Sequence, residues 1–221
     1  MVLIAVIIPS MAEFHYLGGS HWLQDVWEVP CLLVSMLGLG IRVVTVGHAP
    51  SGTSGRNAIT QVATVLNTTG KYSVVRHPIY LGNFFMWLGV SLFHGIWWVP
   101  LIFSLVFCLH YERIMFAEEE FLECKFGSEF EDWARRTPAF IPRFSQWVAP
   151  ALPFSWRKVL KGENASLTGA ITIFGGLSLI EQLAMEEELR IDALWQVLVP
   201  VTWIAFVVLR FLKRHTSLLD A

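Results

Sequence analysis

Residues 78–111 read PIYLGNFFMWLGVSLFHGIWWVPLIFSLVFCLHY, and none of these 34 residues is Asp, Glu, Lys or Arg. One helix needs about 20 apolar residues to cross the hydrocarbon core of a bilayer, so this run is long enough for two crossings. Gly95 and Pro100 interrupt it near the middle, where a turn is favoured. We therefore predict a tight helical hairpin of about 79–94 and 97–112, with both of its ends on the same side of a membrane.

The composition of the whole chain is also typical of a membrane protein. Of its 221 residues, 54% are hydrophobic and only 15% are charged, whereas about a quarter of the residues in a soluble domain are charged. The formal net charge of −2 provides no basic field that would hold nucleic acid. The three cysteines, two of them in apolar runs, indicate neither a disulfide framework nor a zinc cluster.

Three further segments are long and apolar enough to cross a membrane, at about 29–46, 167–184 and 193–212. Residues 1–12 are apolar but short, and they lack the basic start and the cleavage site of a signal peptide. We count residues 1–12 as the remainder of one more transmembrane span. The fold class predicted from the sequence is therefore an all-α, polytopic integral membrane protein with five or six transmembrane helices.

The distribution of basic residues predicts the orientation, because Lys and Arg near helix ends stay mostly on the cytoplasmic side. Fifteen of the sixteen basic residues belong to three stretches or to the span ends that face them. These stretches are residues 47–77, residues 112–166 and the tail from Arg210. Only Arg190 lies on the other side. The polar stretch 112–166 is therefore expected to be cytoplasmic.

The segment that enters the hairpin, residues 70–82, reads GKYSVVRHPIYLG. It places Arg76, His77 and Tyr80 within five positions at a helix N-terminus, which favours anions. Taken singly, Arg76 is a boundary anchor, Pro78 occupies the first position of a helix, and Tyr80 belongs to the interfacial aromatic belt. The clustering of a cation, an imidazole and a phenol favours a binding site over these separate roles.

The segment that leaves the hairpin, residues 112–126, reads ERIMFAEEEFLECKF. At 100° per residue, its apolar side chains form one helical arc, with Glu118 near the centre and Glu119 at the edge. A carboxylate on a buried face needs a partner. That partner is either a protein cation, such as Arg76 or Arg113, or a ligand with a hydroxyl pair or a positive centre, and the sequence leaves both open.

Other familiar site patterns are incomplete in this sequence. Residues 47–54 have the glycine spacing of a phosphate-binding loop but lack its lysine. Gly38 and Gly40 lie within an apolar span, which favours helix packing over dinucleotide binding. Since His94 and His110 fall in opposite arms of the hairpin, they are expected at opposite membrane faces, and we expect no metal site.

Read in order, the chain carries R-H-P-x-Y-x-G at 76–82, an apolar hairpin, E-E-x-x-L-x-x-x-F-G at 118–127, and F-I-P at 140–142. In this combination it resembles the isoprenylcysteine carboxyl methyltransferase family and, more loosely, the phospholipid methyltransferases, which are integral-membrane enzymes that use S-adenosylmethionine. The resemblance spans about 67–144. It implies methyl transfer to a lipid or lipidated acceptor, a carboxylate, phosphate or amine, at the cytoplasmic face of a membrane.

The resemblance also implies that segments 70–82 and 112–144 together form the cofactor pocket. The residues it assigns to cofactor binding are Tyr72, His77, Pro78, Tyr80, Gly82, Glu118 and Glu119. The candidate catalytic residues are Arg76, Arg113 and Glu119, with Arg143 as a further choice for positioning an anionic acceptor. Residues 1–166 then form the membrane methyltransferase core, and 167–221 add a transmembrane hairpin and a cytoplasmic tail.

The chain departs from the family at Phe130 and Trp133, where two tyrosines are usual after F-G; the ring bulk is kept and the phenolic hydroxyls are lost. Two alternatives to the methyltransferase remain. One is a membrane sterol or enone reductase, which would need a nicotinamide site that the sequence does not show. The other is a non-catalytic scaffold in which Arg76 pairs with Glu118. The expected partners are the bilayer and a lipid or lipidated substrate, without nucleic acid or metal.

Overall fold

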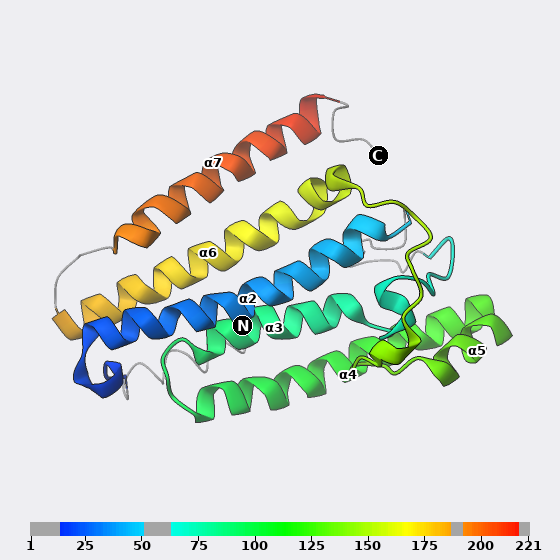
Figure 1. The fold of residues 1–221 in the computed structure, drawn as a ribbon, viewed down its shortest axis with the longest axis horizontal. Helices are drawn as coiled ribbons and strands as arrows, with labels where there is room; N and C mark the ends of the chain where they lie inside the picture. The colour runs from blue at the N-terminus through cyan, green and yellow to red at the C-terminus, as the bar shows by residue number, and fades with distance from the viewer. Residues whose placement is uncertain (1–13, 51–62, 187–191, 217–221) are drawn as a thin grey trace.

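The computed structural model describes residues 14–50, 63–186 and 192–216, and regular structure in this part of the chain is helical. Its α-helices are α2 (His21–His48), α3 (Pro78–Leu92), α4 (Trp98–Phe126), α5 (Ser128–Arg136), α6 (Trp156–Glu186) and α7 (Ala193–His215). Three short 3-10 turns accompany them: η2 (Leu17–Gly19), η3 (Lys71–Ser73) and η4 (Phe144–Gln146). The long helices lie side by side in the spatial order α7, α6, α2, α3, α4 (Figure 1).

Four of these helices, α2, α4, α6 and α7, are long and apolar enough to cross a membrane. The all-helical membrane fold is therefore confirmed, whereas five or six spans are not. The helical hairpin is present, with Gly95 at its turn in a left-handed conformation (φ 66°). Its first arm, α3, has 15 residues, and at about 1.5 Å per residue it is shorter than the hydrocarbon core. Residues 1–12 and Arg190 lie outside the described residues.

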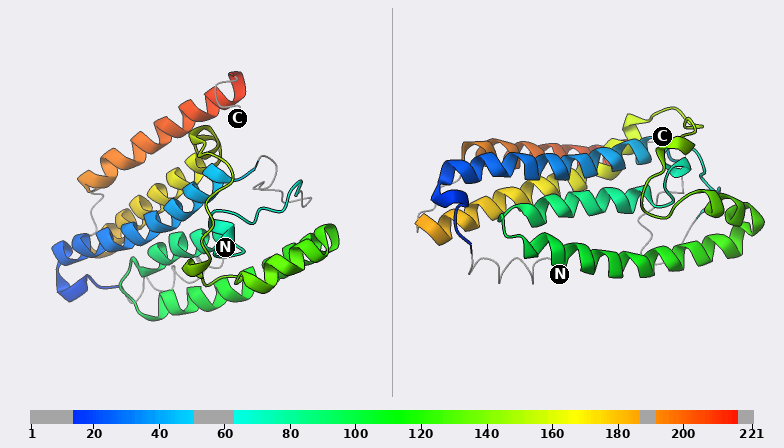
Figure 2. Two further views of the ribbon diagram at one scale, coloured as in Figure 1. Left: turned by 45° about the vertical axis from the view of Figure 1, so that its right-hand side comes forward. Right: turned by 60° about the horizontal axis from the view of Figure 1, so that its bottom comes forward.

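Three helices extend beyond the predicted apolar segments. Helix α4 continues to Phe126 instead of ending near residue 112, α6 begins at Trp156 instead of 167, and α2 begins at His21 instead of 29. The added stretches are polar, but they contain strong helix formers such as Glu, Lys, Leu and Ala, so an established helix continues past the membrane boundary. As a result, the acidic half of α4 runs past α3 toward α5 as a rigid arm (Figure 2).

Helices α2 and α3 approach each other closely because glycines lie where they cross. A Cβ atom added at Gly38 would lie 2.4 Å from the carbonyl oxygen of Gly82, and one at Gly89 would lie 2.4 Å from that of Cys31. Gly38 is therefore a packing residue, as the sequence indicated. Gly40 differs, because nothing lies within 4 Å of an added Cβ atom there.

Helix α6 packs on α2 and is part of the same core. Buried side chains from α2, the α3 end, α6 and α7 form one hydrophobic cluster, which consists of Cys31, Val90, Phe93, Ile171, Phe174, Leu177 and Trp195. Helix α6 also runs through position 166 without a break. The functional division of the chain at that position stays a prediction.

We predict opposite effects for alanine at the two glycines of α2. Gly38→Ala should lower the free energy of unfolding by about 1–3 kcal/mol, because the methyl group overlaps the α3 backbone. Gly40→Ala should be neutral or stabilising by up to about 1 kcal/mol, since it replaces glycine in an open helical position. Denaturant unfolding of the detergent-solubilised protein measures both; equal values for the two variants would contradict the close crossing.

Candidate functional site

The two segments that flank the hairpin are held together by the backbone. The amide of Arg76 donates to the carbonyl of Pro138 at 2.8 Å, and the amide of Arg143 donates to the carbonyl of Val74 at 2.9 Å. These backbone hydrogen bonds fix residues 138–143 beside the start of α3. Pro78 occupies the first turn of α3, as the sequence indicated, so the side chains just before and after it project toward α4.

Arg76 is the centre of the charged network. Its Nε donates to Oε1 of Glu119 at 2.8 Å and its Nη2 to Oε2 at 3.1 Å, a two-pronged ion pair. Its Nη1 donates to the carbonyls of Ala134 and Thr137, at 2.8 and 3.0 Å, where α5 ends. One guanidinium therefore joins the start of α3, the acidic arm of α4 and the C-terminus of α5.

His77 lies between the two glutamates and is buried. Its Nε2 is 2.7 Å from Oε1 of Glu119, and its Nδ1 is 3.5 Å from Oε2 of Glu118. Burial by itself lowers the pKa of His77, but the hydrogen bonds and negative charges of the two carboxylates outweigh it and raise the pKa above the usual 6.5. The imidazole is thus held toward its protonated form.

Tyr80 binds the second glutamate, one turn further along α3. Its hydroxyl donates to Oε2 of Glu118 at 2.9 Å, and its ring stacks on His77 with the ring centres 5.5 Å apart. The Glu118 side chain remains 39% exposed, against 24% for Glu119. Glu118 is therefore the carboxylate that a ligand can reach, whereas Glu119 is engaged by Arg76 and His77.

Tyr72 forms the wall beside Glu118. It packs on a hydrophobic cluster with the buried rings of Phe130 and Trp133, and the Trp133 indole donates to the carbonyl of Tyr72 at 3.1 Å. Burial raises the pKa of Tyr72 well above its usual value, and the negative charge of Glu118 raises it further. Phe130 and Trp133 thus support Tyr72 through apolar contacts.

The structure does not bring every predicted residue into this network. Gly82 faces α2, and a Cβ atom there would lie 2.5 Å from Cγ of Arg42, so the position serves the helix crossing. Arg113 is exposed on α4 and forms no hydrogen bond or ion pair with the site residues described above. Arg143 is also exposed and contributes its backbone amide. The scaffold alternative paired Arg76 with Glu118, but its partner is Glu119.

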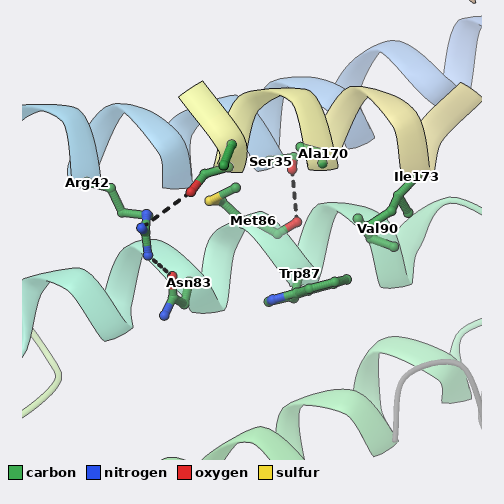
Figure 3. Close-up of a pocket in the computed structure, with 11 residues that line it drawn as sticks. Ser35, Arg42, Asn83, Met86, Trp87, Val90, Ala170 and Ile173 are labelled. Carbon is green, nitrogen blue, oxygen red and sulfur yellow. Dashed lines mark hydrogen bonds between the residues drawn. The ribbon is translucent and has the colours of Figure 1, made fainter. Parts of the chain in front are cut away.

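A second polar network lies deeper in the bundle and was missed from the sequence. Arg42 pairs with Glu163 of α6, at 2.8 Å from Nε and 2.9 Å from Nη2, and both side chains are buried. Its Nη1 also donates to the side-chain oxygen of Asn83 on α3 (Figure 3). The available signal was that Arg42 is the one charged residue in the apolar segment 29–46, where a charge marks a candidate site.

Arg42 and Asn83 line one end of a pocket of about 210 Å³ between α2, α3 and α6. Its other walls are mostly apolar and include Met86, Val90 and Ile173 (Figure 3). The amide of Asn83 also donates to the Tyr111 hydroxyl at 3.1 Å, and the rings of Tyr80 and Tyr111 are 5.0 Å apart. Polar side chains thus connect this pocket with the Glu118 site.

Comparison with known proteins identifies related sequences. Residues 30–129 match the family model described as phospholipid methyltransferase. The chain is 36% identical to the nickel-cobalt-cadmium resistance protein of Alcaligenes xylosoxydans xylosoxydans, over 65% of this chain and 63% of that protein. It is 35% identical to the cobalt-zinc-cadmium resistance protein of Cupriavidus metallidurans, over 63% of this chain and 62% of that protein.

A third relative is the protein-S-isoprenylcysteine O-methyltransferase of Schizosaccharomyces pombe, which is 38% identical over 35% of this chain and 33% of that enzyme. The matches thus cover less than two thirds of the length of each of these relatives. No solved structure matches the chain.

We predict that Glu119→Gln destabilises the protein by about 2 kcal/mol, because it removes the charge that holds Arg76 and His77. Glu120→Gln is the matched control, since Glu120 is the exposed neighbour on the same helix. Thermal and denaturant unfolding in detergent should separate the two variants. If Glu119→Gln unfolds like Glu120→Gln, the ion pair does not support the fold.

The raised pKa of His77 predicts a pH-dependent stability. Its contribution is fully present below the unfolded value of 6.5 and is lost as the pH rises through the higher folded value. The melting temperature of the wild-type protein should therefore fall across this window, and His77→Gln should flatten the decline. His110→Gln, at an exposed histidine of α4, should keep the wild-type slope; an unchanged slope in His77→Gln would contradict the assignment.

Proposed function

This chain belongs to the family of the isoprenylcysteine carboxyl methyltransferases and phospholipid methyltransferases, and we propose that it transfers a methyl group from S-adenosylmethionine to a lipid or lipidated acceptor. The observation that carries the proposal is the meeting of Glu118 with His77 and Tyr80. These residues come from opposite ends of the hairpin, and they leave one carboxylate partly exposed beside an imidazole and a phenol.

The side chains at this site fit the cofactor. S-adenosylmethionine, when bound, supplies an activated methyl group on a positively charged sulfur. The exposed carboxylate of Glu118 would accept hydrogen bonds from ribose hydroxyls or lie beside the positive charge. His77, which precedes the first turn of α3, and Tyr80 would hold the methionine carboxylate at the helix N-terminus. Tyr72 would close the wall of the pocket.

Arg76 and Glu119 have a different role in this proposal. Because each occupies the other through two hydrogen bonds, they position His77 and α5 and do not themselves contact the substrate. The chain's task in an in-line methyl transfer is to align the acceptor and exclude water. An anionic acceptor needs no general base, and charge neutralisation between anion and sulfonium is favoured in a setting of low dielectric constant.

The pocket between α2, α3 and α6 is the proposed site for the acceptor's apolar portion. Its apolar walls suit a hydrocarbon chain, and Arg42 and Asn83 mark its polar end. Tyr111 connects that end with Tyr80, so an acceptor group placed there would lie toward the cofactor residues. The pocket volume of about 210 Å³ holds part of a lipid chain, and the remainder would lie in the bilayer.

The proposed site faces the cytoplasm. The C-terminal end of α7 and the N-terminal ends of α5 and α6 lie at the same end of the bundle as the site (Figure 1). These elements and their neighbours carry most of the chain's basic residues, namely Lys125, Arg135, Arg136, Arg143, Arg157, Lys158, Lys161, Arg210, Lys213 and Arg214. Lys and Arg at helix ends favour the cytoplasmic side.

The direct test incubates the purified protein with S-adenosylmethionine carrying a labelled methyl group and a total lipid extract. The expected result is label in a lipid fraction, with mass spectrometry showing a lipid heavier by one CH2 group. That lipid identifies the acceptor class. If the protein neither binds the cofactor nor labels any lipid or prenylated peptide, the proposed activity is wrong.

We predict that Glu118→Gln weakens binding of S-adenosylmethionine at least about tenfold, because a charge-assisted contact is lost. Its melting temperature should change little, since the side chain is 39% exposed. Glu120→Gln should bind like the wild-type protein. Equilibrium binding of the labelled cofactor measures all three proteins, and wild-type affinity in Glu118→Gln would remove this residue from the site.

A second candidate function is a contribution to resistance against divalent transition metals. The observation that favours it is the naming of two relatives as metal-resistance proteins. Growth on inhibitory cobalt tests it, in a strain that lacks the gene and carries either the wild-type copy or Glu118→Gln. Restored growth with the wild-type copy alone would make resistance depend on Glu118, and no difference from the empty strain would dismiss this candidate.

A further inference from the structure

The end of the bundle opposite the proposed methyl-transfer site carries a separate polar cluster. It lies where the N-termini of α2 and α7 meet the C-terminal part of α6 (Figure 1). Its members are His21, Gln24, Asp25, Glu28, His94, Ser178, Glu181, Gln182 and Asp192. Since α2 alone spans 28 residues, or about 40 Å, this cluster does not belong to the Glu118 site.

Three side chains of this cluster present metal-binding atoms to one another. Nδ1 of His21 and one carboxylate oxygen each of Asp25 and Asp192 all lie within 4.8 Å of one another. The His21 and Asp25 atoms are 3.1 Å apart. Around a tetrahedral ion with bonds of about 2.0–2.2 Å, neighbouring ligand atoms lie about 3.4 Å apart. The His21–Asp25 pair therefore has nearly the required spacing, and the Asp192 oxygen lies within 4.8 Å of both atoms.

The Asp192 carboxylate is held in place by side chains that are not ligands. Ser178 donates to its Oδ2 at 2.8 Å, and the amide of Gln182 donates to the same oxygen at 2.6 Å. Hydrogen bonds of this kind orient metal-binding carboxylates. Both donors come from α6, so three helices contribute to one arrangement.

Two buried amide oxygens beside the cluster lack a hydrogen-bond donor among the described residues. Gln182 is 3% exposed, and its Oε1 is unpaired although its amide nitrogen binds Asp192. Gln24 is 2% exposed, and its Oε1 is also unpaired. An unpaired buried oxygen is costly, and a cation or its bound water would satisfy it. This observation is independent of the three ligand atoms.

The surrounding charge also favours a cation. Glu28 and Glu181, both buried, add two carboxyl groups close to Asp25 and Asp192. Their hydrogen bonds come from Trp195 and Gln24. Within the part of the chain that the structure describes, no lysine or arginine forms an ion pair with these two glutamates or with Asp192. The charges of Asp25 and Asp192 would themselves favour a positive ion at this place.

We propose that His21, Asp25 and Asp192 bind a divalent first-row transition-metal ion of the zinc, cobalt or nickel type. One imidazole with two carboxylates is a nitrogen and oxygen ligand set that suits these ions better than calcium or magnesium, which take oxygen ligands alone. The ion would tie the starts of α2 and α7 together. This site is independent of the proposed methyl transfer, and it contradicts the expectation from the sequence that the chain holds no metal.

The test titrates Co²⁺ into the purified full-length protein in detergent, with visible absorption as the readout. The expected result is saturation at one Co²⁺ per chain, with absorption bands of a cobalt ion bound to nitrogen and oxygen. Asp192→Asn and Asp25→Asn should each weaken binding at least about tenfold. His215→Ala is the matched control, because His215 is an exposed histidine at the far end of α7, and it should bind like the wild-type protein.

A thermal readout separates loss of the site from loss of the fold. Co²⁺ should raise the melting temperature of the wild-type protein and of His215→Ala, since a ligand of the native state stabilises it. It should leave both aspartate variants unchanged. The Asp25 side chain is 46% exposed, so Asp25→Asn should fold even where Asp192→Asn does not. The proposal fails if the wild-type protein takes up no Co²⁺, or if Asp25→Asn binds it with wild-type affinity.

Discussion

The ion pair between Arg76 and Glu119 is the interaction on which the candidate site depends. It joins residues that are 43 positions apart, and the same guanidinium also holds the carbonyls that end α5. A charge that is partly removed from water needs a fixed partner. Arg76 engages Glu119, whereas the neighbouring Glu118 stays accessible, and the imidazole of His77 lies between the two carboxylates.

The same constraint operates deeper in the bundle. Arg42 and Glu163 are both buried and satisfy each other between α2 and α6. Their pairing places a polar end in an otherwise apolar pocket, and Asn83 extends it toward Tyr111. Isolated charges are excluded from such an interior, so Arg42 connects α2 with α6 through Glu163 and also lines the polar end of the pocket. The same ion pairs therefore join the helices of the bundle and give its sites their polarity.

The two ends of the bundle differ in charge, and the ligands proposed for the two ends differ accordingly. The end with Arg76 and α5 carries most of the lysines and arginines, whereas the end with Asp25 and Asp192 gathers carboxylates and histidines. A basic end suits the cytoplasmic side and anionic lipid headgroups. An acidic end with imidazoles suits metal cations.

Much of the fold was determined by the sequence alone, because hydrophobicity, glycine position and proline position act locally. The uncharged run 78–111 predicted the hairpin, Pro78 predicted the start of α3, and Gly38 predicted a close helix crossing. The order of the two motifs predicted which residues would share a site. Helix ends were predicted less well, since strong helix formers carried α4 on to Phe126, where hydropathy gives no signal.

The tertiary structure alone decided which charges meet. A helical wheel places Glu118 and Glu119 on neighbouring faces, but it does not choose a partner for either, because the choice depends on how α4 is rotated against α3. The same holds for Arg42 with Glu163, and for Asp192 beside His21. These pairs are separated by more than a hundred positions, and only packing of the helices brings them within a few ångströms.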